Sequence, residues 1–71
     1  FVVHNLGNGQ WTITGKKIER LVSITSLVSD DAIKRLSIKM RNMGIDEALR
    51  NAGCQDGDAV SILDFEFEFY D

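Results

Sequence analysis

The chain has 71 residues, a formal net charge of −3, a single cysteine and a single histidine. A chain of this length can bury only one modest core, so we expect residues 1–71 to form one domain. Cys54 has no second cysteine to bond and, with His4, provides too few ligands for zinc, which excludes internal disulfides and Cys/His metal sites.

The sequence shows neither a membrane span nor a secretory signal. No apolar run approaches the roughly 18 residues that a transmembrane helix needs, and no signal-peptide pattern is present. The chain starts at Phe1, inside an apolar run and without an initiator methionine. We therefore expect a piece of a longer, cytoplasmic protein.

Charge is divided unevenly along the chain. All eight Lys and Arg residues lie between Lys16 and Arg50, together with five of the eleven acids. Residues 51–71 carry the other six acids and no base. This division predicts a dipolar molecule whose helical layer is the relatively positive side.

The first elements are two strands, since the segments FVVH and WTIT are rich in β-branched and aromatic residues and enclose the Asn-Gly turn of NLGNG. We predict a hairpin with two possible registers. The face of Trp11 is shared either by Phe1 and Val3 or by Val2 and His4.

A glycine followed by two lysines ends the second strand. A Walker loop needs four residues between its glycines and a hydroxyl after the lysine, but five residues separate Gly9 from Gly15, and Lys17 replaces the hydroxyl. We interpret Gly15 as a strand-to-helix turn and predict no cofactor-binding residue. Lys16 and Lys17 in a first helical turn are a weak hint of an anionic partner.

Three helices are predicted next. Ile18, Leu21 and Val22 form the apolar stripe of the first, which the serines and threonine of residues 23–26 should end. Ser29 should cap the second helix and Gly44 should stop it. Its apolar positions are spaced by three and four residues and predict one buried stripe: Ile33, Leu36, Met40 and Met43.

The segment DEALRNAG predicts the third, short helix. We expect Asp46 to cap it, Ala48, Leu49 and Ala52 to face inward, and Gly53 to be its exit.

The last apolar segments change phase, because even-numbered positions are apolar before Leu63 and odd-numbered ones are apolar after Asp64. A two-residue loop at these positions restores a common face, so we predict a hairpin that pairs Val60 with Phe67. Its three phenylalanines should form a row against the helices with Phe67 near the centre. One long strand with a β-bulge is the alternative, because Leu-Asp is a poor turn pair.

The predicted fold class is α+β. The element order ββαααββ favours a two-layer sandwich, in which a mainly antiparallel four-stranded sheet made of two hairpins is covered on one face by three helices.

Two long segments, TGKKIERL and MRNMGIDEALRNAGCQDGDAVSILDFEFEFYD, resemble the C-terminal domain of the bacterial Obg (Spo0B-associated) GTPases. The resemblance covers essentially the whole chain. We interpret the matching positions as fold-forming: Gly15, Ile18, Glu19, Gly44, Ala48, Leu49, Arg50, Gly53, Gly57, Asp58 and Phe67.

The resemblance implies a parent protein with a glycine-rich N-terminal domain, a central GTP-binding domain and this appended C-terminal domain. Such proteins act in large ribosomal subunit assembly and in stress signalling linked to ppGpp. GTP and Mg²⁺ are expected only in the central domain, so this domain alone should neither bind nor hydrolyse GTP. Its expected partners are its own GTPase domain and/or the ribosome, through ribosomal RNA or a ribosomal protein, and the isolated domain is expected to be a monomer.

The leading hypothesis is thus a non-catalytic regulatory or interaction domain of a ribosome-associated GTPase. A stand-alone ribosomal-RNA-binding module is the second hypothesis. In either case the candidate contact residues are the basic ones on the helices: Lys16, Lys17, Lys34, Arg35, Lys39 and Arg41. A small enzyme is the third, but its carboxylate pairs, Asp56 with Asp58 and Glu66 with Glu68, should be solvated surface, so we predict no catalytic residue.

Overall fold

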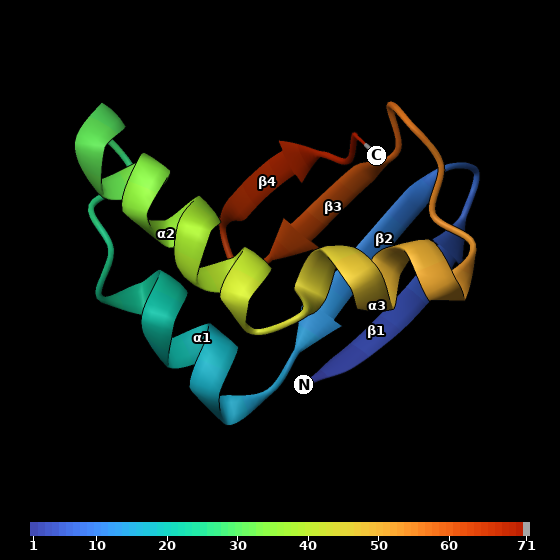
Figure 1. The fold of residues 1–71 in the computed structure, drawn as a ribbon, viewed down its shortest axis with the longest axis horizontal. Coiled ribbons are helices and arrows are strands. Elements are labelled where there is room, and N and C mark those ends of the chain that lie inside the picture. The colour runs from blue at the N-terminus through green and yellow to red at the C-terminus, as the bar shows by residue number, and fades with distance from the viewer. Residues whose placement is uncertain (71) are drawn as a thin grey trace.

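The computed structural model describes residues 1–70. The chain forms four strands and three helices in the order ββαααββ, which confirms the predicted α+β class (Figure 1). The elements are β1 (Val2–Gly7), β2 (Gln10–Thr14), α1 (Lys16–Ser23), α2 (Asp30–Asn42), α3 (Ile45–Ala52), β3 (Ala59–Ile62) and β4 (Phe65–Glu68).

The strands form one sheet in the order β1-β2-β3-β4. Each end of the sheet is an antiparallel hairpin, and the two hairpins meet where β2 runs parallel to β3, with Trp11 opposite Val60. A parallel pair needs a long crossover connection, and the three helices provide it here. The sheet is therefore mixed, but mainly antiparallel as predicted.

The first hairpin has the odd-numbered register. Val3 lies opposite Ile13, and Asn5 lies opposite Trp11, so the face of Trp11 is shared with Val3 and not with His4. His4 occupies the other face, where its Nε2 lies 2.9 Å from Thr14 Oγ1.

The last two strands form the predicted hairpin with a two-residue loop, and the alternative of one long strand with a β-bulge is wrong. Val60 pairs with Phe67, as predicted, and Leu63 reaches the left-handed φ of 54° that such a loop demands. The phenylalanine row is only partly as expected, because Phe65 and Phe69 are buried while Phe67 is half-buried. The side chain of Phe67, at the centre of the row, remains partly exposed because a surface hollow of about 210 Å³ lies between it and α2.

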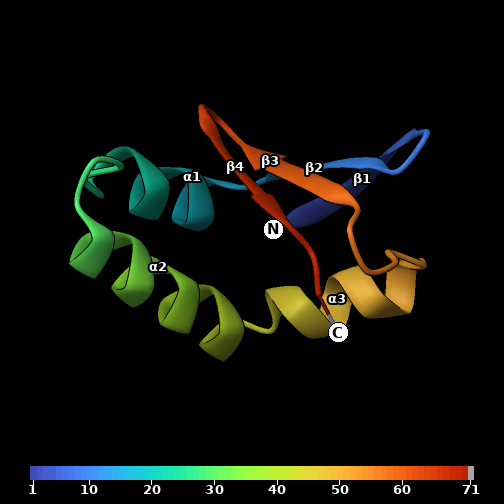
Figure 2. The same ribbon diagram turned by 90° about the horizontal axis from the view of Figure 1, so that it is seen from above.

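The core is one apolar cluster to which every helix and three strands contribute. Its buried members are Trp11, Ile13, Ile18, Val22, Leu36, Met40, Ile45, Leu49, Cys54, Val60, Ile62, Phe65 and Phe69. Figure 2 shows α2 and α3 as a layer on one side of the sheet, with α1 beside the end of the sheet and nearer to its level. The predicted stripe of α2 is confirmed, with its middle residues buried and its outer ones packed against the cluster.

Glycines and one serine set the helix boundaries. The Oγ of Ser29 accepts the amide of Ala32 at 3.3 Å and caps α2, as predicted. Gly44 follows α2 with a φ of 84°, and Gly53 ends α3 with a φ of 103°. Both predicted stops are confirmed. Glycine is suited to these positions because it adopts this left-handed conformation without strain.

The predicted cap of α3 is wrong. Gly44 serves α2 as its stop and α3 as its N-cap, so α3 begins one residue before Asp46 and has no side-chain cap. The side chains that face inward are Ile45 and Leu49, one turn apart and both fully buried, whereas Ala48 is half-buried and Ala52 is exposed.

Candidate interaction surface

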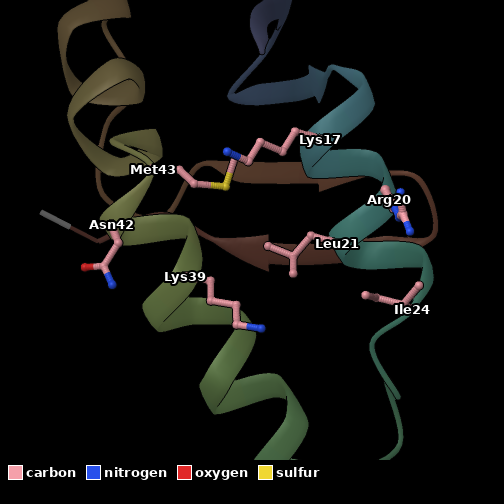
Figure 3. A pocket seen from close by; sticks show the side chains of 7 residues that line it. All are labelled: Lys17, Arg20, Leu21, Ile24, Lys39, Asn42 and Met43. Atoms are coloured by element: carbon pink, nitrogen blue, oxygen red, sulfur yellow. The ribbon is translucent and has the colours of Figure 1, made fainter.

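A surface groove runs between α1 and α2. Its volume is about 330 Å³, and its walls are largely apolar (Figure 3). The lining residues define what we call the α1–α2 groove: Lys17, Arg20, Leu21, Ile24, Lys39, Asn42 and Met43.

Three cations surround this groove. Lys17 and Arg20 come from α1 and Lys39 comes from α2, and all three are exposed. Figure 3 shows Lys17 extending toward Met43 and Lys39 extending from α2 toward α1. Within residues 1–70 these three, which we call the basic rim, form no ion pair, and none of the lining residues is acidic.

The structure divides the six predicted contact residues between two sides of the helices. Lys17 and Lys39 lie in the α1–α2 groove. Arg35 lines a second hollow that adjoins this groove, and Lys39 lines that hollow as well. Arg41 lies elsewhere, with its Nε 3.4 Å from the Asp46 carboxylate. Lys34 shares the helix face of Arg41, seven residues away. Lys16 is exposed at the start of α1 but lines none of these hollows.

Sequence reasoning missed Arg20. The signal was available, because Arg20 follows Lys17 by three residues and therefore lies on the same side of the helix. Its role in the groove depends on the approach of α2, which periodicity does not reveal.

An exposed apolar patch continues the groove into the α1–α2 connection. Ile24 is 73% exposed and Val28 is 96% exposed, and Leu27 lies between them with about a third of its surface exposed. The adjoining hollow, also of about 330 Å³, shares Leu21, Ile24 and Lys39 with the groove. The exposed apolar surface therefore extends beyond the apolar residues that line the groove floor, Leu21, Ile24 and Met43.

The start of α1 does not offer a phosphate site. The amide of Gly15, which a phosphate-binding loop would direct at its ligand, donates instead to the Glu19 carboxylate at 2.9 Å. A carboxylate in this position repels a second anion. The residues present here therefore do not fit GTP, and we derive no nucleotide chemistry from them.

Cys54 is buried beside Asp58. Burial and the nearby negative charge of Asp58 raise the pKa of the Cys54 thiol to about 11, so the thiol is protonated at neutral pH. The Asp58 carboxylate accepts the amide of Gln55 and the indole N–H of Trp11, each at 3.0 Å. These bonds lower the pKa of Asp58 and make it a structural link.

Over residues 1–70, no group of three or more His, Cys, Asp or Glu side chains is arranged to hold a metal ion. In the same part of the chain, none of the helices has the length and apolar character that crossing a bilayer requires.

Comparison with known proteins places the chain in a family. Residues 1–69 match the model of the family described as "Domain of unknown function (DUF1967)". The chain belongs to the DUF1967 family. The match leaves out only the last two residues, so it includes every helix and strand described above.

Several relatives of this DUF1967 chain are named GTPase Obg. That of Bacillus pumilus is 50% identical over 64 residues, which are 90% of this chain and 15% of the relative. That of Halalkalibacterium halodurans is 44% identical over 69 residues, or 97% of this chain and 16% of the relative. That of Listeria monocytogenes is 45% identical over all 71 residues and 17% of the relative. The resemblance to the Obg GTPases is confirmed, and the chain spans about a sixth of the length of these relatives.

Several positions that carry the resemblance have structural roles in this DUF1967 chain. A Cβ at Gly15 would lie 2.8 Å from Phe1 Cα, so glycine is required where the residue before β1 passes the start of α1. Gly44, Gly53 and Gly57 all have positive φ, and Asp58 bonds to Trp11. These roles agree with the interpretation of such positions as fold-forming.

Proposed function

We propose that the chain is a non-catalytic regulatory or interaction domain of an Obg-type GTPase. The observation that carries this proposal is the similarity of essentially the whole chain to a sixth of proteins named GTPase Obg. The remaining five sixths of such a parent leave room for the GTP-binding machinery outside this chain. The basic rim, which has no ion-pair partner among residues 1–70, lies beside an apolar groove and supports a role in binding rather than in chemistry.

We further propose that the parent acts in the cytoplasm, in assembly of the large ribosomal subunit and in stress signalling linked to ppGpp. The partner of the chain is then its own GTPase domain, the ribosome, or both in turn. This part of the proposal rests on the resemblance to the Obg family and on the positive charge of the helices, which suits an acidic protein surface or ribosomal RNA. The chain itself acts as a monomer.

GTP and Mg²⁺ belong to the parent's GTP-binding domain in this proposal, and the chain binds no cofactor. The hydrogen bond between Gly15 and Glu19 supports this view, because it occupies the amide that a phosphate would need.

The second candidate is a ribosomal-RNA-binding module that uses the basic helical face. It is favoured by the placement of all eight bases on α1, α2 and α3, away from the acidic last strands. The apolar floor of the α1–α2 groove and the division of the six contact residues between two sides speak against it.

The deciding experiment compares the intact parent GTPase with the parent cut before Phe1. We expect the truncated protein to differ in steady-state GTP turnover or in co-sedimentation with ribosomes. Equal behaviour in both assays contradicts the proposal. Titration of the 71-residue chain with ribosomal RNA at two salt concentrations tests the second candidate, because phosphate contacts weaken steeply as salt rises.

A further inference from the structure

We propose that the α1–α2 groove binds an acidic amphipathic helix of a partner protein, with the helix's apolar side chains on the groove floor and its carboxylates against the basic rim. This inference rests on the proposed interaction function and deepens it by naming the surface and the chemistry of the partner.

The floor of the groove is apolar and therefore suits apolar side chains of a partner. Leu21 and Met43 pack against the core on one side but remain partly exposed within the groove, and Ile24 is exposed over most of its surface. Covering such apolar surface is favourable because it is removed from water. The volume of about 330 Å³ suits a few side chains of one helix rather than a folded domain.

The basic rim is cationic and therefore suits carboxylates of a partner. Lys17, Arg20 and Lys39 project around the floor from both helices and form no ion pair within the described residues (Figure 3). The acids between residues 51 and 70 lie in the β3–β4 hairpin and the segment before it, and none of the helix acids lines the groove, so the described residues leave the rim uncompensated. A helix with Asp or Glu beside its apolar stripe complements both features at once.

Nucleic acid fits the groove less well. The lining residues include no aromatic side chain on which a base could stack, and phosphates would be desolvated over an apolar floor without gain. A second copy of the chain would have to present its acidic β3–β4 hairpin. Most of the apolar side of that hairpin is already packed in the core, with Val60, Ile62 and Phe65 buried, so it offers the groove little apolar surface.

The probe is a fluorescein-labelled synthetic peptide of about 15 residues, long enough to form a helix, with leucines at i, i+4 and i+7 and glutamates beside them. A second peptide has the same composition with the leucines distributed around the helix. Fluorescence anisotropy with the 71-residue chain measures binding of each, and sedimentation measures self-association. We expect saturable binding of the amphipathic peptide, at least about tenfold weaker binding of its scrambled partner, and a monomeric chain.

Matched variants locate the site. Ile24→Glu alters the groove, whereas Ile38→Glu makes the same change at a 60% exposed position on α2 outside it. Lys39→Glu alters the rim, and Lys34→Glu is its control. Each groove variant should weaken the peptide at least about tenfold, because an apolar contact or an ion pair is replaced by a repelled carboxylate. Each control should stay within about twofold, with unchanged circular dichroism and Tm for all four.

The inference is overturned by a lack of saturable binding of the amphipathic peptide, by equal effects of groove and control variants, or by a chain that self-associates through the groove. Binding of a uridine oligonucleotide that is lost in Lys39→Glu but kept in Ile24→Glu also overturns it, in favour of RNA. The parent truncation experiment is independent of these. A peptide that fails to bind while truncation alters GTP turnover removes the groove but leaves the proposed function. Binding of the peptide without any effect of truncation supports the groove but removes the proposed function.

Discussion

Asp58 joins three parts of the chain that are distant in the sequence. Its carboxylate accepts bonds from Trp11 on β2 and from Gln55 in the turn, and its carbonyl oxygen accepts the amide of Phe69 after β4. One residue thus fastens the central strand, the turn after α3 and the end of the sheet.

The lowered pKa of Asp58 predicts an acid-dependent loss of stability. The amide of Gln55 and then the indole of Trp11 hold this pKa below its ordinary value of 3.8, so the unfolded chain takes up the proton first as pH falls. The contribution is complete above pH 3.8 and is lost as pH falls through the lower folded pKa. Thermal unfolding between neutral pH and pH 2 should show the stability gap between wild type and Asp58→Asn narrowing below about pH 4. Asp64→Asn, in the exposed β3–β4 turn, is the control, and a gap independent of pH contradicts the prediction.

The buried thiol of Cys54 should be unreactive in the folded chain. With a pKa raised to about 11 by burial and by Asp58, almost no thiolate exists at neutral pH. We expect an aromatic disulfide reagent to react at least about 100-fold more slowly with the folded chain than with the chain in denaturant, since the reaction also requires exposure. Equal rates would show that the thiol is accessible and activated.

The two phenylalanines near the end of the chain should differ in their contribution to stability. Phe69 is 2% exposed, so Phe69→Ala should lower the free energy of unfolding by about 3–5 kcal/mol. Phe67 is half-buried at the surface hollow, and Phe67→Ala should cost only about 1–2 kcal/mol. Urea unfolding measures both, and a larger cost at Phe67 would mean that the hollow is closed in solution.

Among the elements, α2 and α3 depend on one left-handed residue between them. Gly44 closes the first helix and opens the second, and a Cβ there meets no atom within 4 Å. Replacement therefore strains the backbone without causing a clash.

This absence of a clash makes Gly44 a test of conformation alone. Gly44→Ala should lower the free energy of unfolding by about 1–2 kcal/mol, and Gly44→Asn by less, because asparagine tolerates the left-handed region better. Gly15→Ala is the contrast, since its Cβ would lie 2.8 Å from Phe1 Cα and should cost more than Gly44→Ala. Thermal unfolding of the three variants measures the order, and equal costs for alanine and asparagine at Gly44 would contradict the role of φ.

Local signals were sufficient to predict the elements but not how they meet. The spacing from Ile33 to Met43 and the stops at Gly44 and Gly53 are local properties, and the structure confirms them. The parallel pairing of β2 with β3 and the hollow beside Phe67 depend on contacts between distant segments, which no periodicity encodes. The candidate surface was predicted only in part for the same reason. Lys17 and Lys39 were foreseen as basic residues, but the groove between them exists only where α1 packs beside α2.

For the whole molecule, the charge division along the chain becomes a difference between elements, because the helices carry eight bases against five acids and the last hairpin carries acids alone. All eight bases lie on the helices, and the acids Asp64, Glu66 and Glu68 lie in the last hairpin. The bases on the helices are themselves of two kinds, because Arg41 pairs with Asp46 while the basic rim forms no ion pair with any residue that the structure describes.

This second division predicts unequal effects of charge reversal in the parent GTPase. Arg35→Glu/Lys39→Glu should weaken its association with ribosomes or with its own GTPase domain, most visibly at low salt, because exposed charges reach only roughly 8 Å at about 0.15 M. Lys34→Glu/Arg41→Glu, with the same change of charge on the other side of α2, should have the smaller effect. All four residues are exposed, so both variants should fold. Pull-down at two salt concentrations measures the association, and equal losses would show that net charge alone matters.

The parallel pairing of β2 with β3 also constrains the order of events during synthesis. Trp11 and its bonding partner Asp58 are 47 residues apart, and all three helices lie between them. The first hairpin leaves the ribosome long before β3 exists, and until then the only tryptophan of the chain has a neighbouring strand on one side only. Loop closure over so long a separation comes late and makes folding cooperative. A nascent chain halted before β3 should therefore lack a complete core to stabilise its short helices, and the burial of Trp11 between two strands marks the completion of the fold.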